Sequence, residues 1–269
     1  MDKETTVRYI KTNGILPESK FGQNFLCDED VVSKIIEAAD LKSGDKVLEI
    51  GPGIGALTRP LSKLDIGLTC VEIDKRLASL LRDDPEIRAE MIDQDFLKLK
   101  DYKAEEFDIV ISNLPYYVMT DIMKKLFGEY SGARKMVFMV EDEAIARIDC
   151  GPNTKQYGPL AILCSLYGKY TYEFKVPHTA FVPQPRTTSA VISFSRTESA
   201  DILSSEFVKF LNASFSMRRK MLKKNLASFA SSDSVNEAFG KVGISENARA
   251  EELRPDEFAS LFTQLRSST

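Results

Sequence analysis

The sequence has few of the residues on which many catalytic and metal sites depend. It contains one histidine, His178, so a Ser-His or Cys-His arrangement would have to use the proline-flanked segment KVPHTAFVP. Its four cysteines are widely spaced and form no CxxC pair, which argues against a zinc site and against a disulfide framework. We therefore expect reduced cysteines and no metal centre.

Long apolar runs are also missing. No apolar segment approaches the roughly 20 residues that a membrane-spanning helix needs. The N-terminal segment MDKETTVRYIKTNG is charged and lacks the apolar stretch and small-residue cleavage site of a secretory signal. A chain of 269 residues with 43% hydrophobic residues can still bury a sizeable core. These features predict a globular, cytoplasmic protein without membrane segments, and we expect it to be a monomer.

An excess of positive charge is absent as well. The net charge is −4 and the pI is about 5.4, which is the wrong sign for a protein that binds RNA by bulk electrostatics. Charge is segregated along the chain, however. Acidic residues crowd the stretch 83–108, whereas the segment SMRRKMLKKN (216–225) carries five cations and no acid. Binding to nucleic acid would therefore depend on a local basic surface.

Short apolar runs alternate with helical patterns over residues 28–195, which predicts an α/β fold with a mainly parallel, Rossmann-like seven-stranded sheet. The expected strands are 46–51, 68–74, 89–95, 107–113, 135–141, 170–176 and 189–195. The first four are joined by segments long enough for one crossover helix each, and the last two suit an antiparallel pair at one edge. Beyond Thr197 only helical periodicity remains. We expect a domain over 1–197 and a small C-terminal helical domain over 198–269, with a last helix that begins near Pro255.

A glycine-rich segment, VLEIGPGIGALT, joins the first expected strand to a helix. Gly51, Gly53 and Gly55 allow a tight turn and a close approach of the backbone to a ligand. The GxGxG spacing alone does not separate a methyl donor from the dinucleotides of dehydrogenases. A nicotinamide-dependent oxidoreductase is therefore one alternative.

Acidic residues follow the next two expected strands. Glu72 ends the second strand, where a carboxylate can accept both ribose hydroxyls of an adenosyl group. Asp95 ends the third, where it can accept a hydrogen bond from an adenine amino group, and Phe96 can pack on the ring. Because ligands of open α/β sheets bind at the carboxyl ends of strands, these residues predict one cofactor crevice. The alternative is that both acids are solvated loop carboxylates.

The fourth expected strand ends in Asn113, Leu114, Pro115 and Tyr116. An adenine amino nitrogen is a poor nucleophile because its lone pair is delocalised into the ring. The Asn113 side-chain oxygen and the Leu114 carbonyl can draw its hydrogens out of plane, since Pro115 fixes the backbone and offers no N–H. Tyr116 offers a face on which an everted base can stack. The alternative is an ordinary strand-to-helix turn.

Taken together, the motifs identify a family. They are KFGQNFLCD (20–28), the glycine loop, VEID, the DFL around Asp95, NLPYYVMT, FVPQPRTTSAV and FSMRRKMLKKNL. In this order they resemble the rRNA adenine N6,N6-dimethyltransferases, which modify two adjacent adenines near the end of small-subunit rRNA. The resemblance implies S-adenosylmethionine as the cofactor and the small ribosomal subunit, with its 16S rRNA, as the partner.

The resemblance also implies roles for individual residues. The segment 1–28 would cover the cofactor. The implied cofactor-binding residues are Gln23, Asn24, Leu26, Gly51, Gly53, Glu72, Ile73, Asp95, Phe96 and Asn113. Phe181 would be a second aromatic opposite Tyr116, with a core aromatic as the alternative. The cations of a basic helix would contact rRNA phosphates, with a solvated face as the alternative. These cations are Arg218, Arg219, Lys220, Lys223 and Lys224.

The chain departs from the family pattern after the fifth strand. Glu141 and Asp142 stand where the family usually has Gln and Lys, which makes one rim of the expected cleft more acidic. Within the same chemistry, the runner-up is a large-subunit rRNA methylase of the macrolide-resistance type. Those proteins are typically more basic and have isoleucine at the position of Leu114, so the residue present favours the small-subunit enzymes. Another alternative is a ribosome-assembly factor in which methylation is secondary.

Overall fold

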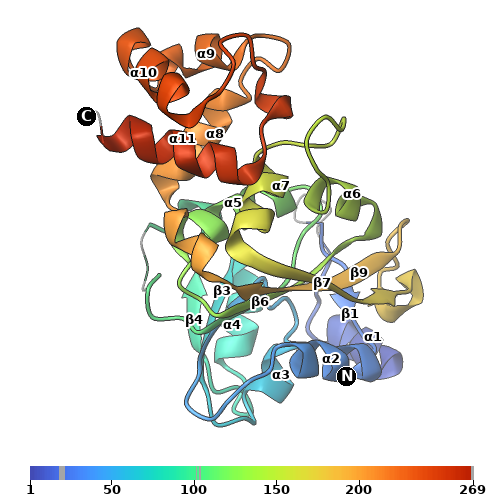
Figure 1. The fold of residues 1–269 in the computed structure, drawn as a ribbon. Helices are drawn as coiled ribbons and strands as arrows, with labels where there is room; N and C mark the ends of the chain where they lie inside the picture. Colours follow the sequence, from blue (N-terminus) through green and yellow to red (C-terminus); the bar gives the residue numbers. More distant parts are fainter. Residues whose placement is uncertain (18–21, 101, 103, 268–269) are drawn as a thin grey trace. The chain divides into compact units, whose positions relative to one another are not determined.

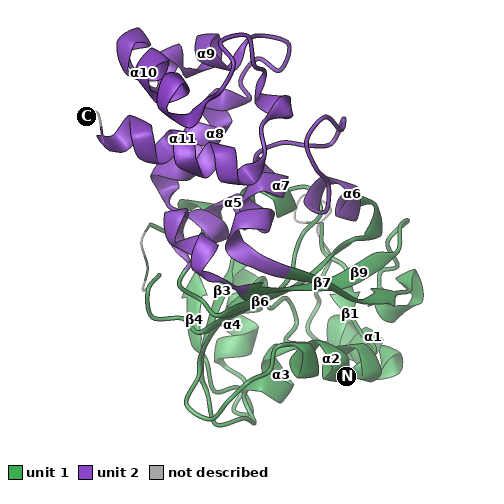
Figure 2. Ribbon diagram, in the orientation of Figure 1, with its two compact units in different colours: residues 1–122, 132–143, 170–195 green, residues 123–131, 144–169, 196–269 purple. Residues whose placement is uncertain are grey.

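The computed structural model describes residues 1–17, 22–100, 102 and 104–267 (Figure 1). Lys20, part of the KFGQNFLCD motif, lies outside the described residues. The chain forms two compact units (Figure 2). Unit 1 contains Met1–Ile122, Gly132–Glu143 and Tyr170–Ser195, and unit 2 contains Met123–Ser131, Ala144–Lys169 and Arg196–Thr269. The units are interleaved along the chain, and a functional division after residue 197 remains a prediction.

The main sheet has seven strands in the described residues, in the order β4-β3-β2-β5-β6-β9-β7. The strands are β2 (Lys46–Ile50), β3 (Gly67–Glu72), β4 (Glu90–Asp93), β5 (Ile109–Asn113), β6 (Lys135–Glu141), β7 (Gly168–Val176) and β9 (Ser189–Arg196). The pairs among β2 to β6 are parallel, and β9 runs antiparallel to β6. All seven expected strands are present, and β7 and β9 are neighbours at one edge as predicted. The α/β fold class is confirmed.

The strand order reverses at β2, and this reversal positions the site. β3 and β5 lie on either side of β2, with Ile50 opposite Val71 on one side and Ser112 on the other. In doubly wound sheets a crevice opens outside the carboxyl ends of the strands at such a switch point. The glycine loop, Glu72 and Asn113 follow or end these strands. The topology therefore brings them to one place.

Helices of unit 1 connect and cover these strands. They are α1 (Lys3–Thr12), α2 (Glu29–Ala38), α3 (Thr58–Leu61), α4 (Lys75–Arg82) and the start of α5 (Met119–Glu129). The expected crossover α-helix between β4 and β5 is wrong for the described residues, which contain only the 3-10 turn η2 (Phe96–Lys98) there. Between Phe96 and Phe107 the one other buried residue described is Leu99. So few apolar positions cannot hold a helix against the sheet.

A second, two-stranded sheet joins distant parts of unit 1. β1 (Phe25–Leu26) pairs antiparallel with β8 (Phe181–Val182), with Leu26 opposite Phe181. The Cys27 N–H extends the pairing by donating to the Ala180 carbonyl at 2.8 Å. Leu26 and Phe181 both belong to the core that also contains Val47 and Ile109 of the main sheet. β1 is thereby tied to the segment that carries Phe181.

Unit 2 is helical over the part of the chain that the structure describes, apart from short strand ends. Its elements include α6 (Ile145–Ile148), α7 (Pro159–Tyr167), η5 (Glu198–Ile202), α8 (Ser205–Ser214), α9 (Leu222–Asn225), η6 (Leu226–Ser228), α10 (Ser232–Val242), η7 (Ala250–Glu252) and α11 (Pro255–Ser267). Phenylalanines form its core, with ring centroids of Phe207 and Phe210 at 5.1 and 5.3 Å from that of Phe262. The start of the last helix at Pro255 is confirmed. None of the described helices is long and apolar enough to cross a membrane.

The expected basic helix is wrong for three of its five cations, whereas Lys223 and Lys224 lie on α9. α8 ends at Ser214 and α9 begins at Leu222, so Arg218, Arg219 and Lys220 lie on the turn between them, here called the basic turn (216–221). The Asn225 side-chain amide donates to the carbonyls of Ser214 at 2.7 Å and Met217 at 3.2 Å. These bonds satisfy carbonyls at the end of α8 and reverse the chain.

Candidate functional site: a cavity at the carboxyl ends of the strands

Unit 1 contains a cavity of about 250 Å³ where β2, β3 and β5 end. It gathers every residue predicted for cofactor binding or catalysis. These are Gln23, Asn24, Leu26, Gly51, Gly53, Glu72, Ile73, Asp95, Phe96, Asn113, Leu114, Pro115, Tyr116 and Phe181. The structure therefore brings them together in space, while their individual roles remain predictions.

The glycine loop forms one wall of this cavity. Gly51 and Gly53 have φ of +68° and +60°, a region that L-residues with a Cβ seldom adopt. A Cβ on Gly51 would meet no atom within 4 Å, because the position faces open space. A Cβ on Gly53 would lie 3.4 Å from the Phe25 ring. Glycine thus leaves room for a ligand beside the backbone of the loop.

Glu72 lies beneath this loop with only 4% of its surface exposed. One carboxylate oxygen accepts a hydrogen bond from the Gly53 N–H and the other from the Asp74 N–H, both at 2.9 Å. Burial raises the pKa of Glu72, and these backbone donors oppose the shift. Each oxygen keeps a lone pair that can accept a further hydrogen bond. The side chain is thus held in one orientation and can still bind a diol.

Asp95 and Phe96 form the adjoining wall. The Asp95 carboxylate accepts a hydrogen bond from the Leu97 N–H at 3.0 Å and lies 3.7 Å from the Lys98 ammonium. It therefore caps η2 while it lines the cavity. Phe96 is 4% exposed and also lines the cavity.

The segment before β1 is held against the α4 end of the site. The Gln23 amide donates to Asp74 at 3.0 Å, and Arg76 donates to the same carboxylate at 2.7 and 3.1 Å. The Arg76 guanidinium, with Gln23, lowers the pKa of Asp74 to about 2. Asn24 donates to the Gly22 carbonyl at 3.2 Å. Asp74 and Arg76 were not predicted from sequence, since carboxylate and guanidinium pairs are common on surfaces.

Asn113 and Tyr116 occupy the end of β5. The strand end is fixed by Ser112, which donates to the Ile50 carbonyl at 2.6 Å, and by the Leu114 N–H, which donates to Met139 at 3.0 Å. The Asn113 side chain makes no hydrogen bond to any described residue, although it lines the cavity. Tyr116 is half-buried, and its hydroxyl lies 2.6 Å from the Ser189 hydroxyl. An amide without a hydrogen-bond partner among the described residues and a fixed aromatic ring thus line the same cavity.

The position of Phe181 agrees with both of the roles considered for it, a core aromatic and a wall of the site. It is 1% exposed and belongs to the main core, as a structural aromatic would. It also lines the cavity, opposite Leu26 in the β1–β8 pair. A role against the target base remains a prediction.

Glu49 and Tyr117 are among the cavity residues that sequence reasoning missed. Glu49 is 2% exposed, and burial raises its pKa to about 7, while Cys70 approaches its carboxylate at 3.5 Å. A charged residue inside the apolar run VLEI was the signal that could have found it. Tyr117 lines the cavity with 58% of its surface exposed. The sequence offers no signal that would assign a role to this second tyrosine in addition to Tyr116.

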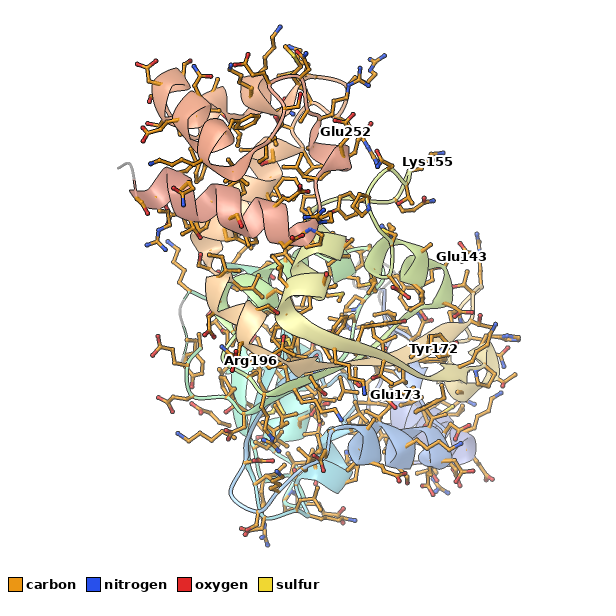
Figure 3. The ribbon with its side chains drawn as sticks, viewed as in Figure 1. Glu143, Lys155, Tyr172, Glu173, Arg196 and Glu252 are labelled. Carbon is orange, nitrogen blue, oxygen red and sulfur yellow. The ribbon has the colours of Figure 1, made fainter. Side chains whose placement is uncertain are left out.

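Glu141 and Asp142, which the sequence predicts at one rim of the cleft, are not among the described residues that line the cavity, and both are engaged by side chains of unit 1. The Thr187 hydroxyl donates to Glu141 at 2.8 Å. Asp142 pairs with Lys175 at 3.0 Å and accepts a hydrogen bond from Tyr172 at 3.3 Å (Tyr172 is labelled in Figure 3). The negative charge that the sequence places here is thus partly neutralised within the rim.

The basic cluster of unit 2 divides into paired and unpaired cations. Arg218 pairs with Glu251 at 2.9 Å and donates to the carbonyls of Thr154 and Lys155 at 2.8 and 2.5 Å (Lys155 is labelled in Figure 3). Lys223 lies 3.6 Å from a Glu246 carboxylate. The remaining predicted cations have no ion pair with a described residue. They are Arg219, Lys220 and Lys224.

A mostly parallel seven-stranded sheet with a cavity at the ends of its central strands defines a Rossmann-like, ligand-binding α/β protein. A family model described as ribosomal RNA adenine dimethylase matches residues 17–267. The chain belongs to this family of rRNA-modifying enzymes.

Individual relatives agree with the family assignment. Ribosomal RNA small subunit methyltransferase A of Listeria monocytogenes is 37% identical over 274 residues, covering 95% of this chain and 93% of that protein. The protein of the same name from Geobacillus thermodenitrificans is 37% identical and covers 98% and 94%. The crystal structure of a dimethyladenosine transferase from Plasmodium falciparum has the same fold, with a TM-score of 0.70 at 23% identity over 90% of this chain and 98% of that one.

Proposed function

We propose that this protein transfers methyl groups from S-adenosylmethionine to N6 of two adjacent adenines in the 16S rRNA of the small ribosomal subunit. The observation that carries the proposal is the Asn113 side-chain amide, which makes no hydrogen bond to a described residue and lines the same cavity as Tyr116, the glycine loop and Glu72. The names of the relatives support the small subunit as the substrate. Leu114 also favours it over the large subunit.

The cavity residues fit the proposed cofactor. Glu72 would accept hydrogen bonds from the ribose hydroxyls, Asp95 would accept one from the adenine amino group, and Phe96 would pack on the adenine ring. Ile73 adds an apolar wall, and Gly51 and Gly53 leave space for the ligand next to the loop. Gln23, Asn24 and Leu26 would cover it from the N-terminal segment. When bound, S-adenosylmethionine supplies an electrophilic methyl group on a sulfonium.

The target adenine would be held by the NLPY turn. Its N6 hydrogens would be bound by the Asn113 side-chain oxygen and the Leu114 carbonyl, which localises the nitrogen lone pair. Pro115 sets the direction of that carbonyl, and the Tyr116 ring stacks on the base. Phe181 would close the opposite side. Stacking offsets part of the few kcal/mol that eversion of a base costs. The proton released from N6 leaves to water, so no side-chain base is required.

Unit 2 would supply electrostatic contacts to the rRNA. Arg219, Lys220 and Lys224 have no acidic partner among the described residues, so their charge is available to phosphates. Arg218 and Lys223 are partly neutralised by Glu251 and Glu246. We infer that the first three dominate the salt-dependent part of binding. We also infer that the protein acts as a monomer in the cytoplasm, where ribosomal subunits are assembled.

The experiment that tests this function offers the protein a radiolabelled methyl donor with undermethylated small or large subunits. Label in adenine of the small subunit, at two methyls per modified base, is the expected result. Label in the large subunit alone would favour the macrolide-resistance type, and binding without label would favour an assembly factor. A parallel calorimetric titration should detect S-adenosylhomocysteine and no NAD, which separates the proposal from an oxidoreductase.

A further inference from the structure

The Tyr116 ring is held at its far end by a buried serine. The hydroxyls of Tyr116 and Ser189 lie 2.6 Å apart, a normal hydrogen-bond distance between two hydroxyls. Ser189 has no exposed surface and begins β9 of the main sheet. Its Cα pairs with that of Glu141 in the antiparallel β6–β9 ladder. The serine hydroxyl is therefore carried by a rigid element.

The near end of the same ring is fixed by the NLPY turn. The Leu114 N–H donates to the Met139 carbonyl at 3.0 Å, and the Val118 N–H closes the turn on Pro115 at 3.2 Å. A ring held at both its Cα and its hydroxyl can neither swing about the Cα–Cβ bond nor tilt freely. Its plane is thus set before any base arrives, which reduces the ordering that binding would otherwise require.

The surroundings also keep the Tyr116 hydroxyl protonated. Burial raises the pKa of Tyr116 and the charge of Glu141 adds to the rise, while the hydrogen bond with Ser189 opposes it in part. The Glu141 carboxylate is itself engaged by the Thr187 hydroxyl at 2.8 Å. A neutral phenol can share a hydrogen bond with Ser189 over the ordinary pH range.

We propose that Ser189 is a positioning residue, which acts through the Tyr116 hydroxyl to hold the ring in the plane on which the target adenine stacks. The proposal rests on the proposed function. Stacking alone would not require the hydroxyl, because a phenylalanine ring offers the same face to a base. The proposal therefore gives the tyrosine hydroxyl a role of its own, which is to hold the ring in place.

The test is a double-mutant cycle on methylation of undermethylated small subunits. Ser189→Ala and Tyr116→Phe each remove one partner of the same hydrogen bond, and each should lower kcat about 3- to 10-fold, the usual worth of one neutral bond. The double variant should fall no further than the lower single variant, since the bond is lost only once. Calorimetry should show unchanged binding of S-adenosylhomocysteine in all three.

Ser193→Ala provides the matched control. Ser193 is also buried on β9, but its hydroxyl donates to Glu173 at 2.5 Å (Glu173 is labelled in Figure 3). The kcat of Ser193→Ala should therefore stay at the wild-type value. If Ser189→Ala does not fold, Ser189→Cys, which keeps the volume and weakens the bond, takes its place.

Two outcomes would overturn the proposal: wild-type kcat in either single variant, or a double variant whose loss is the product of the single losses. All comparisons are made relative to a wild-type enzyme that methylates adenine. A wild type without that activity contradicts the proposed function itself, so the two failures are distinguishable.

Discussion

The carboxylate of Glu72 accepts a hydrogen bond from the Gly53 N–H at 2.9 Å, so the acid at the end of β3 is tied directly to the loop after β2. This contact joins two motifs that are separated in sequence and fixes the part of the cavity that a ribose would occupy. In the opposite part, the Tyr116 hydroxyl is bonded to Ser189, whereas the Asn113 side chain makes no hydrogen bond to a described residue. We take this to mean that the cofactor half and the Tyr116 ring are preorganised, while the Asn113 amide is left for the substrate.

Replacing Glu72 tests the cofactor half. Glu72→Ala should weaken binding of S-adenosylhomocysteine about 10- to 100-fold, because hydrogen bonds to a charged acceptor are lost. Asp93→Ala is the matched control, since Asp93 lies beside Glu72 in the β3–β4 register but is exposed and outside the cavity lining. Isothermal calorimetry measures both. An unchanged dissociation constant for Glu72→Ala would remove this residue from the site.

The buried carboxyl of Glu49 should make stability depend on pH. Burial raises its pKa from 4.5 to about 7, so between these values the folded protein keeps a proton that the unfolded chain releases. This contribution is fully present below the lower value and is lost as pH rises through the upper one. Glu49→Gln should therefore gain stability relative to wild type as pH rises from about 5 to 8.

Urea unfolding at several pH values measures this difference. The exposed Glu86→Gln provides the control and should parallel the wild type. A constant difference between Glu49→Gln and wild type across the range would mean that Glu49 does not bind the proton assigned to it.

Charge reversal on the basic turn tests the rRNA contacts. Arg219→Glu with Lys220→Glu should raise KM for small subunits and lower the slope of log affinity against log salt by about 1 per residue. Lys209→Glu, an exposed cation on α8, should leave the slope unchanged. Filter binding at several salt concentrations gives the slopes. Equal salt-dependence slopes in the two variants would mean that the basic turn is solvated and does not contact rRNA phosphates.

Arg218 should behave differently from its neighbour. It donates to the carbonyls of Thr154 and Lys155 and pairs with Glu251, so Arg218→Ala should lower the free energy of unfolding by about 1 to 2 kcal/mol. Arg219→Ala removes a cation of the same kind that has no ion pair with a described residue, and it should change the free energy of unfolding little. Denaturant unfolding of both variants measures these changes. Equal free energies of unfolding would contradict a stabilising role for Arg218.

The sheet was predictable because the apolar runs are short, well separated and long enough to cross a core. The site was predictable because strand ends meet at a switch point, which places Gly51, Glu72 and Asn113 together from their strand positions alone. Contacts between side chains that are distant in sequence could not be predicted. The Tyr116–Ser189 bond spans 73 residues, and no local pattern encodes it.

The basic segment 216–225 shows where local sequence composition predicts the wrong secondary structure. Its residues have helical composition, yet Asn225 binds the Ser214 carbonyl and the chain turns between them. The paired state of Arg218 likewise depends on Glu251, a residue that only the fold brings near. Side-chain hydrogen bonds to backbone carbonyls override helical propensity in such places.

The most direct test of the account is nucleoside mass spectrometry of 16S rRNA after incubation of undermethylated small subunits with wild type or Asn113→Ala. The wild type should yield N6,N6-dimethyladenosine at two adjacent positions. Asn113→Ala should lower its formation about 100-fold or more, with binding of S-adenosylhomocysteine nearly intact. Wild-type product from Asn113→Ala, or methylation at another atom or in the large subunit, would contradict the claim that this amide holds an everted adenine for transfer.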